Sequence, residues 1–437
     1  MNILSPPETV REMTILNKEK FTKRVQLPYI MIPSMSIGRI IGSRVVRSCS
    51  VPILKRIKPI MNTEHPEMKL LLLNPDNLNE ERENELVEAI RTLCNITPDI
   101  MSKEFTFTYD DFDIKSSIRA ILPQGIEFSG YSQIGHIAHC NLRENLLPYK
   151  YTLGQLILDK VNWCKTVVNK LDTISSEFRF FEMELLAGEK NYITTVVEDK
   201  IKYKLDFSRV FWNSRLSNEH KRIIEKLDKN SIVYDGFAGV GPFVLPAAKK
   251  GVRKVFGNDL NPESVKWMKE NLKINKIDEK LVDISNLDCG EFFKTIVKND
   301  LLSYKDLEYQ PSNAHIIMNL PALAVTFLPH LKGLLEGEDY KKYNFNIIVH
   351  CHLFVKSSVD VPSSWFSEEA SRIVKSNIDI PDLKFLELHN VRNVAGRKEM
   401  FCASFELPKD YLFSLSNTTK RRSDNKEEED IKKIKLS

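Results

Sequence analysis

The stretch Asp235–Phe243 has the sequence DGFAGVGPF and follows a short apolar segment, Ile232–Tyr234. Three glycines fall within it, and beyond it Lys249–Gly251 has the pattern of a helix end, with two cations followed by glycine. Strand, glycine turn and helix in this order are typical of a Rossmann-like fold, in which the turn brings the backbone close to a bound ligand. This stretch therefore predicts a doubly wound, mostly parallel α/β sheet.

The spacing of the three glycines narrows the ligand. Gly236, Gly239 and Gly241 follow the pattern G-x-x-G-x-G, not the G-x-G-x-x-G of dinucleotide binders, and Asp235 precedes them. No pyrophosphate is therefore implied. An acid beside the turn suits a cationic ligand, such as the amino group of a methionine derivative. We predict S-adenosylmethionine, bound by Asp235, Gly239 and Gly241.

Two further acidic positions follow at the expected strand ends. Lys254–Asn258 predicts a second strand, and it runs into Asp259, which is placed to accept hydrogen bonds from ribose hydroxyls, with Leu260 beside it. Leu287 and Asp288 lie at the expected end of a third strand, within reach of an adenine ring. Each acid taken alone is as well explained by a helix cap or a surface charge. Their occurrence at three successive strand ends favours a cofactor site.

A fourth predicted strand, His315–Met318, ends in Asn319–Pro321. Strand ends line the site in a doubly wound sheet. Enzymes that methylate planar nitrogens often carry a short Asn-Pro-type loop at this place, which presents an amide oxygen and backbone carbonyls to the base. We therefore predict that Asn319 and Pro321 line the site. The alternative is an ordinary exit from a strand into a loop.

The 437 residues suffice for two or three domains, and their composition is that of a globular protein. We predict an N-terminal docking domain (1–115), with an amphipathic helix over residues 80–93, a middle α+β domain (116–205), the Rossmann-like domain (206–410) and a disordered charged tail (411–437). No apolar run has the roughly 18–20 residues that a membrane helix needs. Seven scattered cysteines without a CxxC pair indicate reduced thiols in an intracellular protein.

Charge is unevenly distributed along the N-terminal part. Nine basic residues and no acidic one lie between residues 20 and 63: Lys20, Lys23, Arg24, Arg39, Arg44, Arg47, Lys55, Arg56 and Lys58. Such a stretch attracts polyanions, because each phosphate contact releases a counterion. A solvated basic face is an equally good explanation. Its four prolines disfavour a mitochondrial presequence.

Five segments resemble the archaeal and eukaryotic family of tRNA (guanine-37-N1)-methyltransferases. They are Gly135–Glu144, Phe178–Glu189, Trp212–His220, Asp235–Phe243 and Asn319–Pro321. The opening Leu4–Pro7 also resembles the start of eukaryotic members. The resemblance extends to about Leu407 and so covers nearly the whole chain.

The resemblance implies catalytic roles for Glu219, Arg179 and Asn319. Glu219 matches the general base that removes the N1 proton, which requires that burial raise its pKa toward neutrality. Arg179 matches an arginine that stabilises the charge developing on O6. Asn319 matches the residue that positions the base and closes over the cofactor, and His220 matches a cofactor-contacting position.

Simpler explanations exist for these residues. Glu219 could pair with Lys221 or Arg222 on a helix surface, and Arg179 could belong to a structural ion pair. We predict no metal site, because the neighbouring sequence does not complete a zinc ligand set around any histidine. The histidines concerned are His136, His139, His350 and His352.

The resemblance implies methylation of N1 of the guanosine 3′ of the anticodon, which supports reading-frame maintenance in translation. The rivals are transfer of an aminocarboxypropyl group from the same cofactor to a modified guanine, as in the wybutosine pathway, and a catalytically idle RNA-binding adaptor. A nicotinamide dehydrogenase is disfavoured by the glycine spacing. We expect tRNA as partner, no membrane, a monomer, and a location in cytoplasm, nucleus or both, with a mitochondrial matrix pool possible.

Overall fold

The computed structural model describes residues 4–54, 56–171 and 182–414. Contacts divide these residues into two compact units, 4–171 with 182–191, and 192–414. Within the described ranges, no helix is long and apolar enough to cross a lipid bilayer. The seven cysteines are free thiols in the structure, and six of them are buried.

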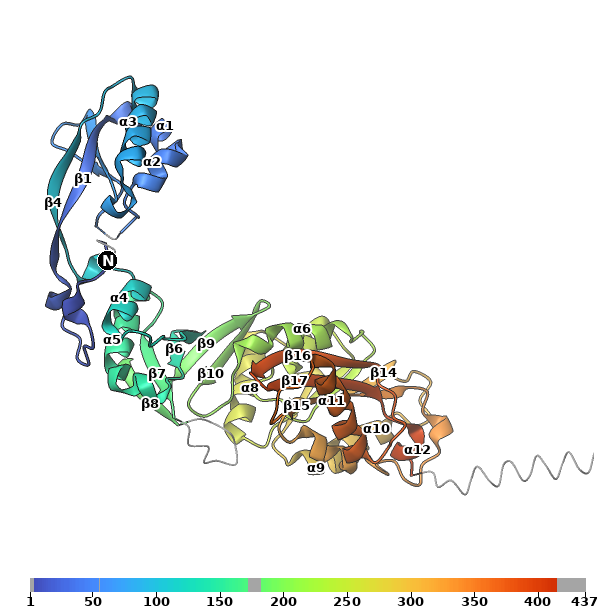
Figure 1. Ribbon diagram of the computed structural model, residues 1–437. Helices are drawn as coiled ribbons and strands as arrows, with labels where there is room; N and C mark the ends of the chain where they lie inside the picture. Colours follow the sequence, from blue (N-terminus) through green and yellow to red (C-terminus); the bar gives the residue numbers. More distant parts are fainter. Residues whose placement is uncertain (1–3, 55, 172–181, 415–437) are drawn as a thin grey trace, which may run out of the picture. The chain divides into compact units, whose positions relative to one another are not determined.

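The first unit contains two four-stranded sheets, with the strand orders β2-β3-β1-β4 and β5-β6-β7-β8. Its elements are β1 (Lys23–Pro33), α1 (Ile37–Gly42), α2 (Arg44–Cys49), β2 (Ile60–Asn62), β3 (Met68–Leu72), α3 (Glu80–Cys94), β4 (Ile100–Phe107), α4 (Ile114–Ile121), β5 (Tyr131–Ile134), β6 (Ile137–Cys140), α5 (Lys150–Lys160), β7 (Thr166–Lys170) and β8 (Met183–Gly188). Helices α1, α2 and α3 lie together against one face of the first sheet (Figure 1).

The predicted N-terminal helix is confirmed as α3. Asn79 caps it by accepting a hydrogen bond from the Arg82 N–H, and Leu86 and Ile90 are buried against the sheet. Asn95 ends the helix in the left-handed conformation. The helical spacing of the apolar residues was therefore sufficient to predict both the helix and its buried face.

The second unit contains a seven-stranded sheet and a separate hairpin. Its elements are β9 (Ile193–Glu198), β10 (Ile201–Asp206), α6 (Ser217–Glu225), β11 (Ile232–Asp235), α7 (Val244–Lys250), β12 (Lys254–Asn258), α8 (Pro262–Ile274), β13 (Val282–Ser285), α9 (Cys289–Phe292), α10 (Lys298–Ser303), β14 (Asn313–Met318), β15 (Asn346–Lys356), α11 (Ser363–Ile378), β16 (Glu387–Ala395), β17 (Lys398–Glu406) and α12 (Lys409–Leu412). The sheet has the order β13-β12-β11-β14-β15-β17-β16, in which β11 to β15 are parallel and β17 is antiparallel to both of its neighbours.

This sheet confirms the predicted doubly wound fold. Strand order reverses between β11 and β14, so their carboxyl ends form the crevice where such sheets bind ligands. Helices α9, α10 and α11 cover one apolar face. Helices α6 and α7 pack on the opposite face, which carries histidines from β14 and β15.

The hairpin of β9 and β10 belongs to the second unit, whereas the sequence placed it in the middle domain. The backbone N–H of Lys204 donates to Asn271 on α8, and that of Lys202 donates to Asn275, which caps the end of α8. Tertiary hydrogen bonds thus determine the unit to which the hairpin belongs. The periodicity of a strand's side chains does not predict such bonds. The predicted boundary after residue 205 therefore differs from the structure.

Candidate active site

The glycine turn after β11 leaves open space above its backbone. Gly239 and Gly241 have φ angles of 55° and 98°, which other residues rarely adopt. A Cβ added at Gly239 would meet no atom within 4 Å, whereas one at Gly241 would strike Leu245 at 2.2 Å. Gly241 is therefore needed for packing, and Gly239 leaves room for a ligand.

Asp235, at the end of β11, is fully buried and half-satisfied. Its Oδ1 accepts a hydrogen bond from the Phe237 N–H at 3.2 Å. Its Oδ2 has no partner among the described residues. Burial, reinforced by the nearby Asp259, raises the pKa of Asp235 to about 8. A buried carboxyl oxygen without a donor is costly, so this position fits a ligand that brings a cationic N–H.

Asp259, after β12, already holds the turn in place. Its Oδ2 accepts from the Gly239 N–H at 2.8 Å, and its Oδ1 accepts from the Asn261 N–H at 2.9 Å. The Ser264 side chain also donates to this carboxylate, which has about four acceptor sites, so one site remains for a ribose hydroxyl. The adjacent Leu260 is 42% exposed, so its side chain is free to contact a ligand.

Asp288 is a helix cap, which was the alternative to a role in cofactor binding. Its side chain caps α9 by accepting from the Gly290 N–H at 2.8 Å. Its neighbour Leu287 packs against the core, two residues beyond the end of β13. The predicted contact of both residues with an adenine ring stays a prediction.

Asn258, which the sequence did not single out, connects three loops. This side chain is fully buried at the end of β12. Its Nδ2 donates to the carbonyls of Gly236 and Leu287, at 3.3 and 2.9 Å. Its Oδ1 accepts from the Ser285 hydroxyl and the Leu287 N–H. A polar residue that ends an apolar strand was the available signal for this role.

The loop after β14 presents a second unsatisfied oxygen. The Oδ1 of Asn319 is buried and has no hydrogen-bond partner in the described ranges. The loop itself is fixed, because the Pro321 carbonyl accepts from the Phe354 N–H at 2.9 Å. Since β11 and β14 are neighbours, Asn319 and Asp235 follow adjacent strand ends at the crevice. These two unpartnered acceptor oxygens thus fit the predicted cofactor and base, which both carry N–H groups.

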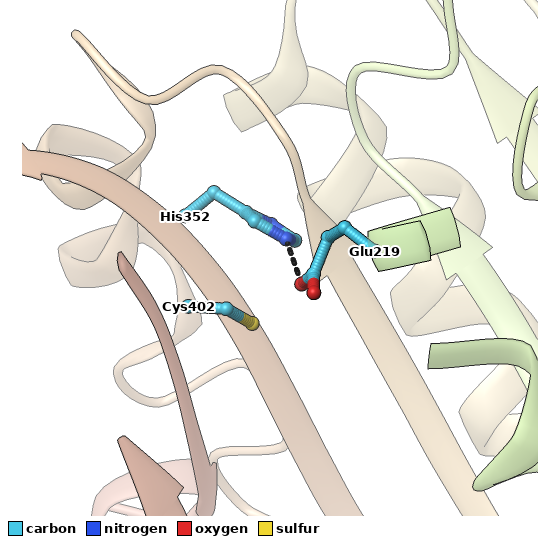
Figure 2. Close-up of side chains that lie close together, drawn as sticks. All are labelled: Glu219, His352 and Cys402. Atoms are coloured by element: carbon cyan, nitrogen blue, oxygen red, sulfur yellow. Dashed lines mark hydrogen bonds and ion pairs between the residues drawn. The ribbon is translucent and has the colours of Figure 1, made fainter. Parts of the chain in front are cut away.

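Glu219 lies in the first turn of α6, and its side chain is 1% exposed. Arg222 donates to both carboxylate oxygens, at 2.7 Å each. His352 on β15 also bonds to Oε1 at 2.7 Å, as Figure 2 shows. Burial by itself raises the pKa of Glu219, but the hydrogen bonds from Arg222 and His352 outweigh it and hold the pKa well below its usual range.

The expectation that burial raises the pKa of Glu219 is therefore wrong for this state. The predicted pairing with Arg222 is present, but in a buried position and not on a helix surface. The sequence could not reveal His352 as the second partner, because the two residues are 133 positions apart.

His220 and Arg179 are the remaining predicted site residues. His220 is buried, bonds to Glu198 at 2.7 Å and packs edge-on against Phe243 at the end of the glycine turn. It therefore adjoins the turn through Phe243, and direct contact with the cofactor stays a prediction. Arg179 lies outside the described residues.

The fold brings potential ligand atoms to His352 that the sequence did not suggest. The side chains of Glu219, His352 and Cys402 place one such atom each within 4.8 Å of one another (Figure 2). The sequence prediction considered only neighbouring positions and so did not include Glu219 and Cys402, whereas the prediction that no zinc site is present stays a prediction. Since Arg222 occupies both oxygens of Glu219, we describe the group as a charged hydrogen-bonded cluster. Burial opposes the charge on His352, but Cys402 and Glu219 raise its pKa to about 10.

Comparisons with known proteins agree with this geometry. Residues 194–372 match the model of the TRM5/TYW2 methyltransferase domain, and residues 114–191 match that of the TYW2 N-terminal domain. A tRNA (guanine(37)-N(1))-methyltransferase of Caenorhabditis elegans is 41% identical over 100% of this chain and 98% of its own. The human protein of that name is 38% identical over 99% of this chain and 82% of its own.

Solved structures support the fold. Trm5b from Pyrococcus abyssi superimposes with a TM-score of 0.56 at 22% identity, covering 87% of this chain and 98% of its own. A structure described as the complex of aTrm5 and tRNALeu gives 0.61 at 20% identity, covering 87% and 99%. Given the full-length likeness to curated relatives, the chain belongs to the tRNA (guanine(37)-N(1))-methyltransferase family.

Proposed function

We propose that this chain transfers the methyl group of S-adenosylmethionine to N1 of guanosine 37 in tRNA. The observation that carries the proposal is the likeness to curated methyltransferases of that specificity over the whole length of the chain. The open turn at Gly239 and the unsatisfied oxygens of Asp235 and Asn319 support the cofactor and the base.

Asp235 and Asp259 would hold the cofactor at its amino-acid part and at its ribose. The free oxygen of Asp235 suits the ammonium group, and Asp259 suits the ribose. When bound, S-adenosylmethionine supplies an electrophilic methyl group on a sulfonium sulfur. The chain itself contributes position and a dry, negatively charged environment.

Guanine N1 carries a proton at neutral pH, and this proton must leave as the methyl group arrives. Glu219 is the proposed acceptor, and Arg179 the proposed partner of the O6 charge. The oxygen of Asn319 would accept a hydrogen bond from the base and so orient it. Glu219 would accept the proton from N1 as the methyl group supplied by the bound cofactor is transferred to that nitrogen.

Product analysis tests this proposal directly. The protein is incubated with S-adenosylmethionine and tRNA transcripts that carry guanosine, inosine or adenosine at position 37. We expect 1-methylguanosine from the guanosine transcript and no product from the adenosine one, and inosine tests whether the 2-amino group is required. No transfer to any transcript would contradict methyl transfer to guanosine. A parallel incubation with tRNA that carries the modified guanine would then separate the two rivals, because only the aminocarboxypropyl transferase would enlarge that nucleoside and the idle adaptor would leave it unchanged.

The N-terminal basic stretch is a proposed contact for the tRNA body. Arg39, Arg44 and Arg47 on α1 and α2 are exposed and make no ion pair within the part of the chain that the structure describes. Arg56, by contrast, is held by Asp111. The stretch thus separates into structural cations and free ones, and the free ones suit phosphates.

Replacing Arg39, Arg44 and Arg47 by glutamine should weaken tRNA binding. The plot of log K against log salt should become shallower by about 0.9 for each phosphate that the variant no longer neutralises, so by up to about 3. Arg91→Gln is the matched control, because Arg91 in the same unit is already paired with Glu88. An unchanged slope in the triple variant would show that these arginines do not contact phosphates and form only a solvated basic face.

A further inference from the structure

Arg222 bridges two carboxylates of unequal exposure. Its Nε and Nη2 donate to both oxygens of Glu219 at 2.7 Å, and its Nη1 donates to Glu387 on β16 at 2.5 Å. The side chain of Glu219 is 1% exposed, and that of Glu387 is 34% exposed. The guanidinium therefore links a buried group with the edge of the sheet.

Glu219 cannot accept a proton efficiently in this arrangement. A general base needs a free lone pair aimed at the substrate and a pKa near the working pH. Oε1 of Glu219 accepts from Arg222 and His352, Oε2 accepts from Arg222, and these donors hold the pKa of Glu219 well below the usual range. Oε2 keeps one acceptor site, but a carboxylate with so low a pKa is a weak base, so efficient proton transfer requires that Arg222 leave first.

We propose that Arg222 and Glu387 are positioning residues for methyl transfer, in which Arg222 holds Glu219 in the free enzyme and shifts onto Glu387 when the target base enters. This inference rests on the proposed function, because it takes Glu219 as the proton acceptor. Once Arg222 has moved, Glu219 keeps its bond to His352 and regains a free oxygen.

Glu387 has room for a second hydrogen bond from Arg222. Its Oε2 takes Arg222 and Lys226, and its Oε1 lies 3.9 Å from Nδ1 of His389, beyond hydrogen-bond distance. A shift of the guanidinium would thus replace one two-point contact by another. Arg222 stays beside a carboxylate throughout, which avoids the large cost of a buried unpaired charge.

The other groups that face Glu219 come from the three strands under α6. They are His352 on β15, Cys402 on β17 and His389 on β16, whose Nε2 lies 3.8 Å from Oε2. Only His352 among them donates a hydrogen bond to Glu219 in the structure. Removal of Arg222 therefore leaves one strong donor, and the pKa of Glu219 should rise.

The test measures single-turnover methyl transfer to guanosine-37 tRNA from pH 5 to pH 9. Glu387→Gln should lower the rate about tenfold without changing the KM for S-adenosylmethionine, because the second acceptor is weakened. Glu387→Asp should restore part of that rate. At limiting tRNA, where the rate profile reports the free enzyme, Arg222→Met should move the acid limb upward by at least about one pH unit, from below pH 5 in the native chain toward the measured range, since a pKa shift of one unit is a tenfold change in protonation.

Arg372→Met is the matched control. Arg372 makes the same two-point contact three residues from its carboxylate, Glu369, on α11. Its loss should leave both the rate and the pH profile unchanged.

Three results separate the possible failures. A wild-type rate in Glu387→Gln would overturn the shift of Arg222, as would a folded Arg222→Met variant with an unmoved acid limb. If Arg222→Met does not fold, Glu387→Gln and Glu387→Asp still decide. A wild-type rate in Glu219→Gln would instead remove Glu219 as the proton acceptor, while methyl transfer by the native chain would stand.

Discussion

Asp235 and Glu219 are both buried carboxyl groups of the second unit, and the structure treats them in opposite ways. Asp235 has one oxygen without a donor among the described residues, and burial raises its pKa to about 8. Glu219 receives three hydrogen bonds from two cationic side chains, and its pKa is lowered. Asp235 therefore needs a cationic ligand to balance a negative charge, whereas the charge of Glu219 is already balanced by Arg222 and His352.

The largest expected effect of this difference is on folding. Glu219→Gln should lower the free energy of unfolding by about 3 kcal/mol, because it breaks a buried ion pair. Asp235→Asn should raise it by about 1–2 kcal/mol at pH 7, because folding then no longer requires protonation of an acid. Urea unfolding without cofactor measures both.

The pH dependence of stability has opposite signs at the two sites. The lowered pKa of Glu219 contributes stability above its unfolded value of about 4.3, and this is lost as the pH falls toward the folded value. The raised pKa of Asp235 removes stability as the pH rises from about 4 toward 8. Equal signs for the two variants in urea would contradict the comparison.

Variants of Asp235 and Glu219 should also differ in their affinity for the cofactor. Asp235→Asn should weaken binding of S-adenosylmethionine by roughly 10- to 100-fold, which corresponds to a charged hydrogen bond of about 1.5–3 kcal/mol. Glu219→Gln should leave the affinity within about twofold. Calorimetric titration of folded protein measures both, and similar losses in the two variants would place Glu219 in the cofactor site.

The pH dependence of that affinity follows from the raised pKa of Asp235. Below about pH 8 the free protein carries a neutral Asp235, which must lose its proton to pair with a cationic ligand. The affinity should therefore increase as the pH rises, by at most about tenfold per unit, and level off above pH 8. Asp235→Asn should lack this component, and the slope that remains belongs to the ligand itself.

The smallest expected effect concerns the open turn. Gly239 and Gly251 both have positive φ angles, and at both a Cβ would meet nothing within 4 Å. Alanine at either position should therefore cost about 1 kcal/mol of folding stability. Only Gly239→Ala should also weaken binding of the cofactor, because the added methyl group would occupy the space proposed for the ligand. Equal cofactor affinities of the two variants would show that the cofactor does not bind beside Gly239.

Local patterns predicted most of the second unit. The strands β11, β12 and β14 and the end of α7 at Gly251 follow from apolar runs and from glycine, which act over a few residues. The allegiance of the β9–β10 hairpin could not be predicted, because it depends on hydrogen bonds to α8.

In the candidate site, too, local patterns predicted some features, and features that depend on distant residues could not be predicted. Asp235, Asp259 and Asn319 follow strand ends, so topology alone places them at one edge. The environment of Glu219 is set by His352 and Glu387, which lie far along the chain and on strands that the pattern of apolar residues cannot align. The places of these residues in the fold were thus predictable, and the pKa of Glu219 was not.

Asn258 has a consequence for the time course of cofactor capture. Its side chain bonds to Gly236, Leu287 and Ser285, so the loops after β11 and β13 are joined before any ligand arrives. Capture then needs no ordering of these loops. Rapid mixing should show one exponential phase whose rate rises linearly with cofactor concentration, as expected for a ligand that enters a ready-made cradle.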